Sequence, residues 1–160
     1  FNVLQHPEYT EKLCQEFANH FKDMGIETVI GPATGGVILS QVTARLLGVR
    51  SIFTERENGK MTLRRGFKVA PGEKVLIVED IVTTGGSIKE VVDVVNEAKG
   101  DIVGIGLLVD RSGGKADFGV PQEKVYPLLH LTVPTYKPEE CPLCKEGVPI
   151  PERGSHHLKK

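Results

Sequence analysis

The sequence predicts a single α/β domain in which a mostly parallel sheet is covered by helices on both faces. Short apolar runs typical of buried strands alternate along the chain with segments of helical periodicity. With 160 residues, of which 39% are hydrophobic, the chain is long and apolar enough for one core. Ligands of such sheets bind at the carboxyl ends of the strands, so the polar segments that follow the strands are the expected sites of function.

The elements follow one another in the order that this fold class requires. In the first helix Leu13, Phe17 and Phe21 form an apolar stripe that ends before Gly25, and Gly48 closes the second helix in the same way. We expect no internal repeat, low-complexity segment or linker. Helices are predicted over residues 7–25, 35–48 and 87–100, and strands over residues 27–31, 74–80, 101–114 and 124–133.

Residues 51–69 are predicted to form a β-hairpin. The alternating pattern is centred on Asn58-Gly59, which is the strongest short-range hairpin signal. The segment from Arg56 to Lys68 carries five basic residues. Such a hairpin could bind an anionic ligand, or it could be a solvated hairpin whose charges aid solubility.

The composition argues against a nucleic-acid-binding or membrane-spanning protein. The formal charge of −1 gives no general attraction to nucleic acid or membranes, and no apolar run approaches the roughly 20 residues of a membrane span. We therefore expect a soluble, cytoplasmic protein. Because the chain begins with Phe1, we also expect that an N-terminal segment is missing.

The three cysteines do not suggest a disulfide framework, because their number is odd, and they favour a reducing compartment. Cys141 and Cys144 form a single CxxC pair, which supplies two of the four ligands of a structural zinc site. The nearest further ligands are His156 and His157 in the polar tail. Two inert thiols in a terminal turn are the favoured interpretation.

The most informative segment is "VLIVEDIVTTGGS", residues 75–87, in which a buried strand leads into a glycine-rich turn. Gly85 and Gly86 allow backbone N–H groups to converge, and a helix follows at once, so the turn is expected to bind a phosphate over residues 83–87. Ser87 and Glu90 match a capping box, which predicts a helix start at Ser87. The segment is neither a P-loop nor a dinucleotide-binding GxGxxG motif.

Glu79 and Asp80 stand directly before this turn, where two carboxylates would repel a phosphate. Carboxylates accept hydrogen bonds from hydroxyl groups, so the pair suits a ligand with a diol next to its phosphate, such as a ribose 5-phosphate. The simpler alternative is a strand-to-helix turn with acidic residues near the helix N-terminus.

Two acidic residues after an apolar strand, followed by Thr-Thr-Gly-Gly-Ser, resemble the signature of the type I phosphoribosyltransferases, which bind phosphoribosyl pyrophosphate (PRPP). Within them the chain is most similar to the orotate phosphoribosyltransferase family, through "GPATGGVILS", "ERENGKMTLRRGF", "DRSGGKADFGVP" and "CPLCKEGVPIPERGS". The resemblance implies the type I fold over residues 1–137, with a flexible hairpin, a truncated N-terminal hood, and a C-terminal tail over residues 138–160.

The resemblance also implies the activity: transfer of the phosphoribosyl group of PRPP to orotate, with Mg²⁺ held mainly by PRPP, in pyrimidine biosynthesis. It implies a homodimer in which the basic hairpin reaches the neighbouring active site. The residues expected to act in catalysis are Glu79, Asp80, Arg56 and Lys60, and those expected to bind PRPP are Glu79, Asp80, Ile81, Val82, Thr83, Thr84, Gly85, Gly86 and Ser87. Pyrophosphate is expected at Ala33, Thr34, Gly35, Arg56, Lys60 and Arg64.

Arg111, at the end of an apolar strand, is the expected orotate-binding residue, with Thr83 as its partner under the resemblance. A guanidinium can bind a carboxylate through two parallel hydrogen bonds, although Arg111 could instead pair with Asp110. The hairpin lacks a histidine, and Thr34-Gly35 stands where many orotate enzymes have tyrosine and lysine. These departures concern the residues that bind pyrophosphate. Separately, two other functions stay open: salvage of a purine or uracil, and a PRPP-sensing regulator without catalysis, which would need a nucleic-acid surface.

Overall fold

The computed structural model of the chain describes residues 2–134, 136–137 and 139–149. Its helices are α1 (Pro7–Phe21), α2 (Gly35–Leu47), α3 (Gly86–Glu97) and α4 (Pro142–Lys145), with short 3-10 turns at Asn2–Gln5, Lys22–Met24 and Gln122–Lys124. Its strands are β1 (Thr28–Pro32), β2 (Arg50–Glu57), β3 (Lys60–Leu63), β4 (Lys74–Val82), β5 (Asp101–Asp110) and β6 (Val125–His130). None of the described helices is long and apolar enough to cross a membrane.

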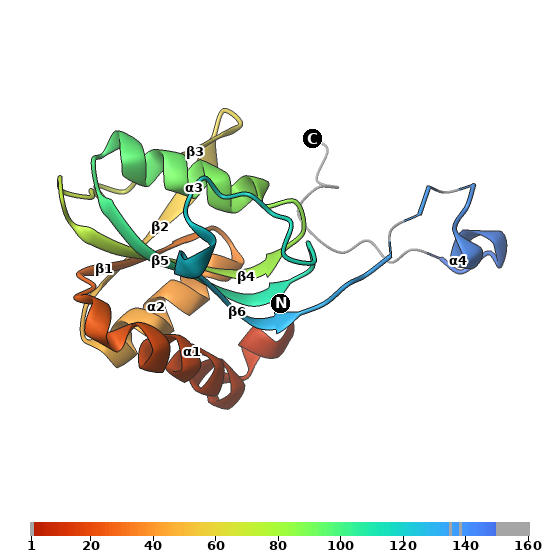
Figure 1. Ribbon diagram of the computed structural model, residues 1–160, viewed down its shortest axis with the longest axis horizontal. Coiled ribbons are helices and arrows are strands. Elements are labelled where there is room, and N and C mark those ends of the chain that lie inside the picture. Colours follow the sequence, from red (N-terminus) through yellow and green to blue (C-terminus); the bar gives the residue numbers. More distant parts are fainter. Residues whose placement is uncertain (1, 135, 138, 150–160) are drawn as a thin grey trace.

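The strands form one sheet in the order β3-β2-β1-β4-β5-β6. All neighbouring pairs are parallel except β2 and β3, which form the antiparallel hairpin. Helices α1 and α2 cover one face of the sheet and α3 covers the other (Figure 1). The predicted fold class, a mostly parallel sheet flanked by helices, is therefore confirmed.

Strand β4 shows why its sequence is a continuous apolar run. Val75 and Ile77 pack into the cluster around α3, whereas Leu76 and Val78 pack into the cluster under α1 and α2. All four side chains are fully buried. Because successive residues of a strand point to opposite faces, both faces must be apolar when both are covered, and each such side chain contributes about 1.5–3 kcal/mol on burial.

The predicted hairpin is also confirmed. Strands β2 and β3 are joined through Asn58 and Gly59, whose φ angles of 52° and 82° are both in the left-handed region. Asparagine and glycine tolerate this conformation better than other residues, which is why this dipeptide specifies a two-residue turn. The tip of the hairpin projects beside α3 at the top of the view in Figure 1.

The predicted start of the third helix was wrong. Helix α3 begins at Gly86 and its N-cap is Gly85, with φ of 84° and no side-chain capping bond. Ser87 lies inside the helix rather than at its N-cap, and the Glu90 carboxylate accepts hydrogen bonds from Arg56. The Glu90 side chain, which a capping box would use, is instead paired with Arg56, a residue far away in sequence.

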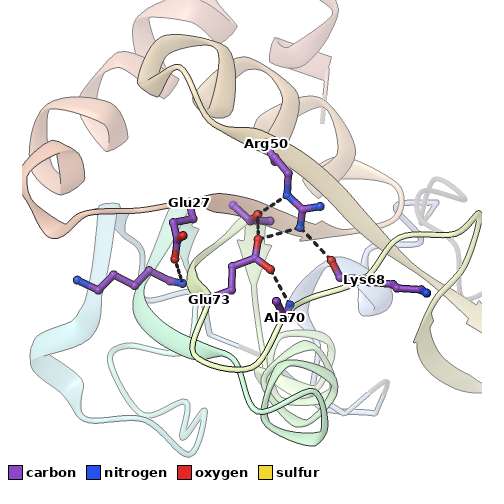
Figure 2. A network of polar contacts seen from close by, with 7 residues as sticks. Glu27, Arg50, Lys68, Ala70 and Glu73 are labelled. Carbon is purple, nitrogen blue, oxygen red and sulfur yellow. Dashed lines mark hydrogen bonds and ion pairs between the residues drawn. The ribbon is translucent and has the colours of Figure 1, made fainter.

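At the amino-terminal edge of the sheet, a polar network joins β1, β2 and the segment that leads into β4 (Figure 2). The Glu73 carboxylate accepts hydrogen bonds from the Thr28 hydroxyl, from Arg50 Nη2 at 2.8 Å and from the Ala70 N–H at 2.7 Å. Arg50 also donates to the Lys68 carbonyl at 2.9 Å. Burial alone would raise the pKa of Glu73, but these hydrogen bonds and the Arg50 charge hold it below its usual value.

Candidate active site

Three loops that follow parallel strands meet at the carboxyl-terminal edge of the sheet. The loop after β1 leads into α2, the loop after β4 leads into α3, and the loop after β5 runs from residue 111 to residue 121. The sheet topology places the ends of β1, β4 and β5 next to one another. Two cavities lie along this edge, and both include residues of the loop after β4.

The first cavity, which we name the phosphate pocket, has a volume of about 180 Å³. The first turn of α3 borders it, and the backbone N–H groups of a first helical turn have no acceptor within their helix. Gly85 is required there, because a Cβ at this position would lie 2.9 Å from the ring of Phe118 and its φ is positive. The pocket is lined by Arg56, Glu79, Ile81, Val82, Thr83, Thr84, Gly85, Gly86, Ser87, Ile88 and Glu90.

Glu79 is a buried carboxyl at the base of the phosphate pocket. Only 7% of the residue is exposed to solvent. Its Oε1 accepts a 3.0 Å hydrogen bond from the Asp80 N–H. Burial, and then the neighbouring Asp80 charge, raise the pKa of Glu79 to about 9. The Glu79 carboxyl is therefore neutral at neutral pH, which reduces the repulsion of a phosphate.

Asp80 lies against the first turn of α2. A Cβ built on Gly35 would lie 2.6 Å from the Asp80 Cγ and Oδ2 atoms, so only glycine leaves room for this carboxylate. The Ala33–Thr34 peptide in the same loop is cis, and the Ala33 N–H donates to the Thr54 carbonyl at 2.8 Å. The fold thus brings the "GPATGG" segment against the paired acids, which are far from it in sequence.

The basic residues of the hairpin are mostly held by carboxylates. Arg56 makes two hydrogen bonds to Glu90 of α3, at 2.7 and 2.8 Å, and is the hairpin cation that lines the phosphate pocket. Arg65 pairs with Glu55 at 2.8 Å. Arg64 pairs with Glu57 at 3.3 Å, and neither it nor Lys60 lines either of the two cavities.

The second cavity, which we name the base cavity, has a volume of about 520 Å³ and shares Thr83 and Thr84 with the phosphate pocket. Arg111 and Thr83, the two residues that the family resemblance paired, both line this cavity. Asp110, the alternative partner of Arg111, instead accepts hydrogen bonds from the Ser112 and Gly114 N–H groups. The lining residues are Thr83, Thr84, Arg111, Ser112, Gly113, Lys115, Thr132 and Val133.

Within the part of the chain that the structure describes, no three His, Cys, Asp or Glu side chains gather in a way that could hold a metal ion. Cys141 is the N-cap of the one-turn helix α4 and Cys144 lies within that helix, and both are free thiols. His156 and His157, the further zinc ligands considered from the sequence, lie outside the described residues.

Comparison with known proteins identifies the family. Residues 2–118 match the model of the phosphoribosyl transferase domain. Orotate phosphoribosyltransferase from Desulforamulus reducens is 59% identical over 98% of this chain and 80% of its own length. The orotate phosphoribosyltransferases of Caldicellulosiruptor bescii and Thermotoga maritima are each 55% identical, over 96% and 98% of this chain and 79% and 82% of their own lengths.

Solved structures share the fold at much lower identity. Adenine phosphoribosyltransferase from Thermoanaerobacter pseudethanolicus superposes with a TM-score of 0.68 at 17% identity, over 81% of this chain and 84% of that one. The enzyme from Rhodothermus marinus gives a TM-score of 0.65 at 24% identity, over 81% and 83% of the two chains. These likenesses establish the type I phosphoribosyltransferase fold and carry nothing about the base. Fold and sequence together show that the chain belongs to the phosphoribosyltransferases and, among them, to the orotate phosphoribosyltransferase family.

Proposed function

We infer that the protein transfers the phosphoribosyl group of PRPP to orotate, which gives orotidine 5'-monophosphate and pyrophosphate in the biosynthesis of UMP. The observation that carries this inference is that two cavities whose linings differ in charge lie side by side and share two lining residues. One has paired acids beside a row of helix N-terminal amides, the other is lined by cations, and Thr83 and Thr84 belong to both. A phosphoribosyl group in the first would present its C1 atom to an anionic base in the second.

We propose that the phosphate pocket binds PRPP through two kinds of group. The N–H groups over residues 83–87 bind the 5-phosphate, because the helix dipole and the unpaired amides of a first turn favour an anion. Glu79 and Asp80 accept hydrogen bonds from the ribose 2- and 3-hydroxyls, and Ile81 and Val82 bring the chain from the acids to the turn.

The same acids support the chemical step. Departure of pyrophosphate leaves positive charge on C1 and the ring oxygen, as in glycoside hydrolysis, and a carboxylate beneath the sugar stabilises that charge. Asp80 suits this role because Gly35 leaves room for its carboxylate, which accepts a hydrogen bond from the Ile81 N–H at 2.8 Å. Orotate arrives as an anion, so no strong general base is required.

Pyrophosphate would leave toward the loop at Ala33, Thr34 and Gly35, whose backbone adjoins Asp80. Mg²⁺ fits this site as an ion held mainly by PRPP, because it commonly keeps its waters and binds one or two carboxylates together with substrate phosphates. When bound, it would neutralise charge on the leaving pyrophosphate. Asp80 is the side chain placed to reach it.

The hairpin supplies further positive charge in this proposal. Arg56 borders its own phosphate pocket, so it can exchange Glu90 for a ligand oxygen without a large movement. Lys60 and Arg64 are exposed and point to neither cavity. In a homodimer these two are the residues that would reach the active site of the neighbouring chain. Mixing subunits that carry Lys60→Ala with subunits that carry Asp80→Asn would then restore part of the activity, whereas sites served within one chain would show no recovery.

The activity is tested by following pyrophosphate release from PRPP and Mg²⁺ with orotate, uracil or adenine as the acceptor. We expect release with orotate and less than about 1% of that rate with the other two bases. Release with uracil or adenine but none with orotate would mean a salvage enzyme, and no release with any base despite PRPP binding would favour a regulator.

A further inference from the structure

The first part of the loop after β5, residues 111–116, is held by two side chains, that of Asp110 at the end of β5 and that of Ser112 in the loop itself. The Asp110 carboxylate accepts hydrogen bonds from the Ser112 N–H at 2.7 Å and the Gly114 N–H at 3.1 Å. The Ser112 hydroxyl in turn accepts from the Lys115 N–H at 3.1 Å and the Ala116 N–H at 3.0 Å. Such side-chain to backbone bonds replace the regular ladder that a loop lacks.

Two further contacts fix the loop to the sheet. The Arg111 N–H donates to the Val82 carbonyl at 2.8 Å, which joins the loop to the end of β4. His130 Nδ1, at the end of β6, lies 3.2 Å from the second oxygen of Asp110, whose side chain is only 6% exposed. The loop is thus anchored at its start from both neighbouring strands.

Among the residues that the structure describes, the cations of the base cavity have no paired carboxylate. Asp110 is next to Arg111 in sequence, but its two oxygens are occupied by backbone N–H groups and by His130. The described lining of the cavity includes two cations, Arg111 and Lys115, and no carboxylate. Thr83, Thr84 and Thr132 add hydroxyl groups that can donate or accept.

We propose that Lys115 is a second specificity-determining residue, which binds the carboxylate of the base together with Arg111. This proposal rests on the function proposed above. The guanidinium of Arg111 offers two parallel donors and the Lys115 ammonium offers a point charge, so one carboxylate can satisfy both. Asp110 and Ser112 are positioning residues, because their side chains hold the backbone of the loop that carries both cations.

The pair of cations explains how the site would reject neutral bases. A carboxylate that enters the base cavity gains charge-assisted hydrogen bonds from both side chains. Uracil has the same ring but no carboxylate, so it leaves both cations without a counter-charge after displacing their water. A site built for a charged group discriminates against a ligand that lacks it more strongly than an apolar site discriminates by size.

The test compares the affinities of orotidine 5'-monophosphate and uridine 5'-monophosphate, which differ only in the carboxylate, by isothermal titration calorimetry. For the unmodified chain we expect the carboxylate-bearing nucleotide to bind at least about a hundredfold more tightly. Lys115→Gln should lower this ratio about tenfold through weaker binding of orotidine 5'-monophosphate alone, since one charge-assisted contact of this kind is worth about a factor of ten. Lys115→Arg should keep most of the ratio.

Lys12→Gln, on the exposed side of α1, is the matched control and should change neither affinity. In turnover assays Lys115→Gln should raise the KM for orotate and leave the KM for PRPP unchanged. The proposal is overturned if Lys115→Gln keeps the affinity ratio, or if it weakens both nucleotides equally. If the unmodified chain itself shows no preference for orotidine 5'-monophosphate, the proposed function fails as well, so the two failures are distinct.

Discussion

The two ends of strand β4 carry two glutamates in opposite environments. Glu73, just before the strand, has its carboxylate bound by Thr28, Arg50 and a backbone N–H, and its pKa is lowered. Glu79, near the end of the same strand, is buried beside another acid, and its pKa is raised to about 9. One strand therefore has a fully paired carboxylate at one edge of the sheet and a poorly paired one at the other.

The different environments of these two glutamates indicate that one contributes to stability and the other to function. A partly buried carboxylate whose hydrogen bonds are all made, such as that of Glu73, stabilises the native state and has no free acceptor for a ligand. A buried carboxyl with a like-charged neighbour costs stability, and such residues cluster at functional sites. The amino-terminal edge of the sheet therefore serves mainly to hold β1, β2 and β4 together, and the carboxyl-terminal edge is where we propose that PRPP binds.

The largest effect is expected from Asp80→Asn. Loss of the negative charge beneath the ribose should lower kcat/KM for PRPP roughly 10²–10³-fold. The melting temperature should stay within about 2 °C, because the intrachain hydrogen bond of the Asp80 side chain is to the adjacent Ile81 N–H and asparagine can keep it. Steady-state kinetics and thermal melts measure the two quantities. A large loss of stability together with the loss of activity would contradict the proposal that one edge of the sheet serves stability and the other serves function.

At the opposite edge, Glu73→Ala should show the reverse pattern. It leaves the buried Thr28 hydroxyl without its acceptor and removes the ion pair with the exposed Arg50, which together should cost about 2 kcal/mol of unfolding free energy. The KM for PRPP should not change in the protein that remains folded. Urea denaturation measures the loss, with Glu57→Ala as control, since its ion pair with Arg64 is exposed and should contribute less than about 0.5 kcal/mol.

Glu79→Gln should change how stability depends on pH. Because the pKa of Glu79 in the folded chain is about 9 and its ordinary value is 4.5, the neutral carboxyl favours folding at low pH, and this contribution is lost as pH rises from about 4.5 to 9. Relative to the glutamine variant, the unmodified chain should lose about 4 kcal/mol between pH 5 and pH 8.5. For Glu73, whose pKa is lowered, the stability contribution is instead lost as pH falls. Parallel pH curves for the chain and its Glu79→Gln variant would show that Glu79 is ionised at neutral pH.

The smallest effect is expected from Gly35→Ala. The new Cβ would displace the Asp80 side chain, which is flexible enough to rotate away, so unfolding free energy should change by less than about 1 kcal/mol. The KM for PRPP should nevertheless rise about tenfold, because Asp80 no longer occupies its place. A double variant with Asp80→Asn supplies the control: if Gly35 acts through Asp80, adding Gly35→Ala to Asp80→Asn should have little further effect.

Local sequence patterns were sufficient for most of the fold. The two-sided apolar run of β4 and the Asn58-Gly59 turn specify structure through neighbouring residues, so a strand buried on both faces and a hairpin could be predicted. The same holds for the phosphate pocket, because Glu79, Asp80 and the glycines of the turn are contiguous in the chain. The ligands proposed for these residues follow from their chemistry, because carboxylates accept hydrogen bonds from sugar hydroxyls and backbone N–H groups donate to a phosphate.

Contacts between residues far apart in sequence could not be predicted. The Glu73 network joins residues of β1, β2 and the approach to β4, and Gly35 is 45 positions from the carboxylate that it accommodates. The predicted capping box failed for the same reason, because Glu90 is bound by Arg56 of the hairpin across the phosphate pocket. The position of Lys115 at the base cavity likewise depends on how the loop after β5 folds around Asp110.

The assignment of the paired acids to the sugar can be measured directly with ribose 5-phosphate and 2-deoxyribose 5-phosphate, titrated into the chain and into a Glu79→Gln/Asp80→Asn double variant by calorimetry. We expect the unmodified chain to bind the ribose form about tenfold more tightly, and the double variant to lose this preference while it still binds both phosphates. The same preference in both proteins, or none in the unmodified chain, would contradict a role for Glu79 and Asp80 in binding the ribose hydroxyls.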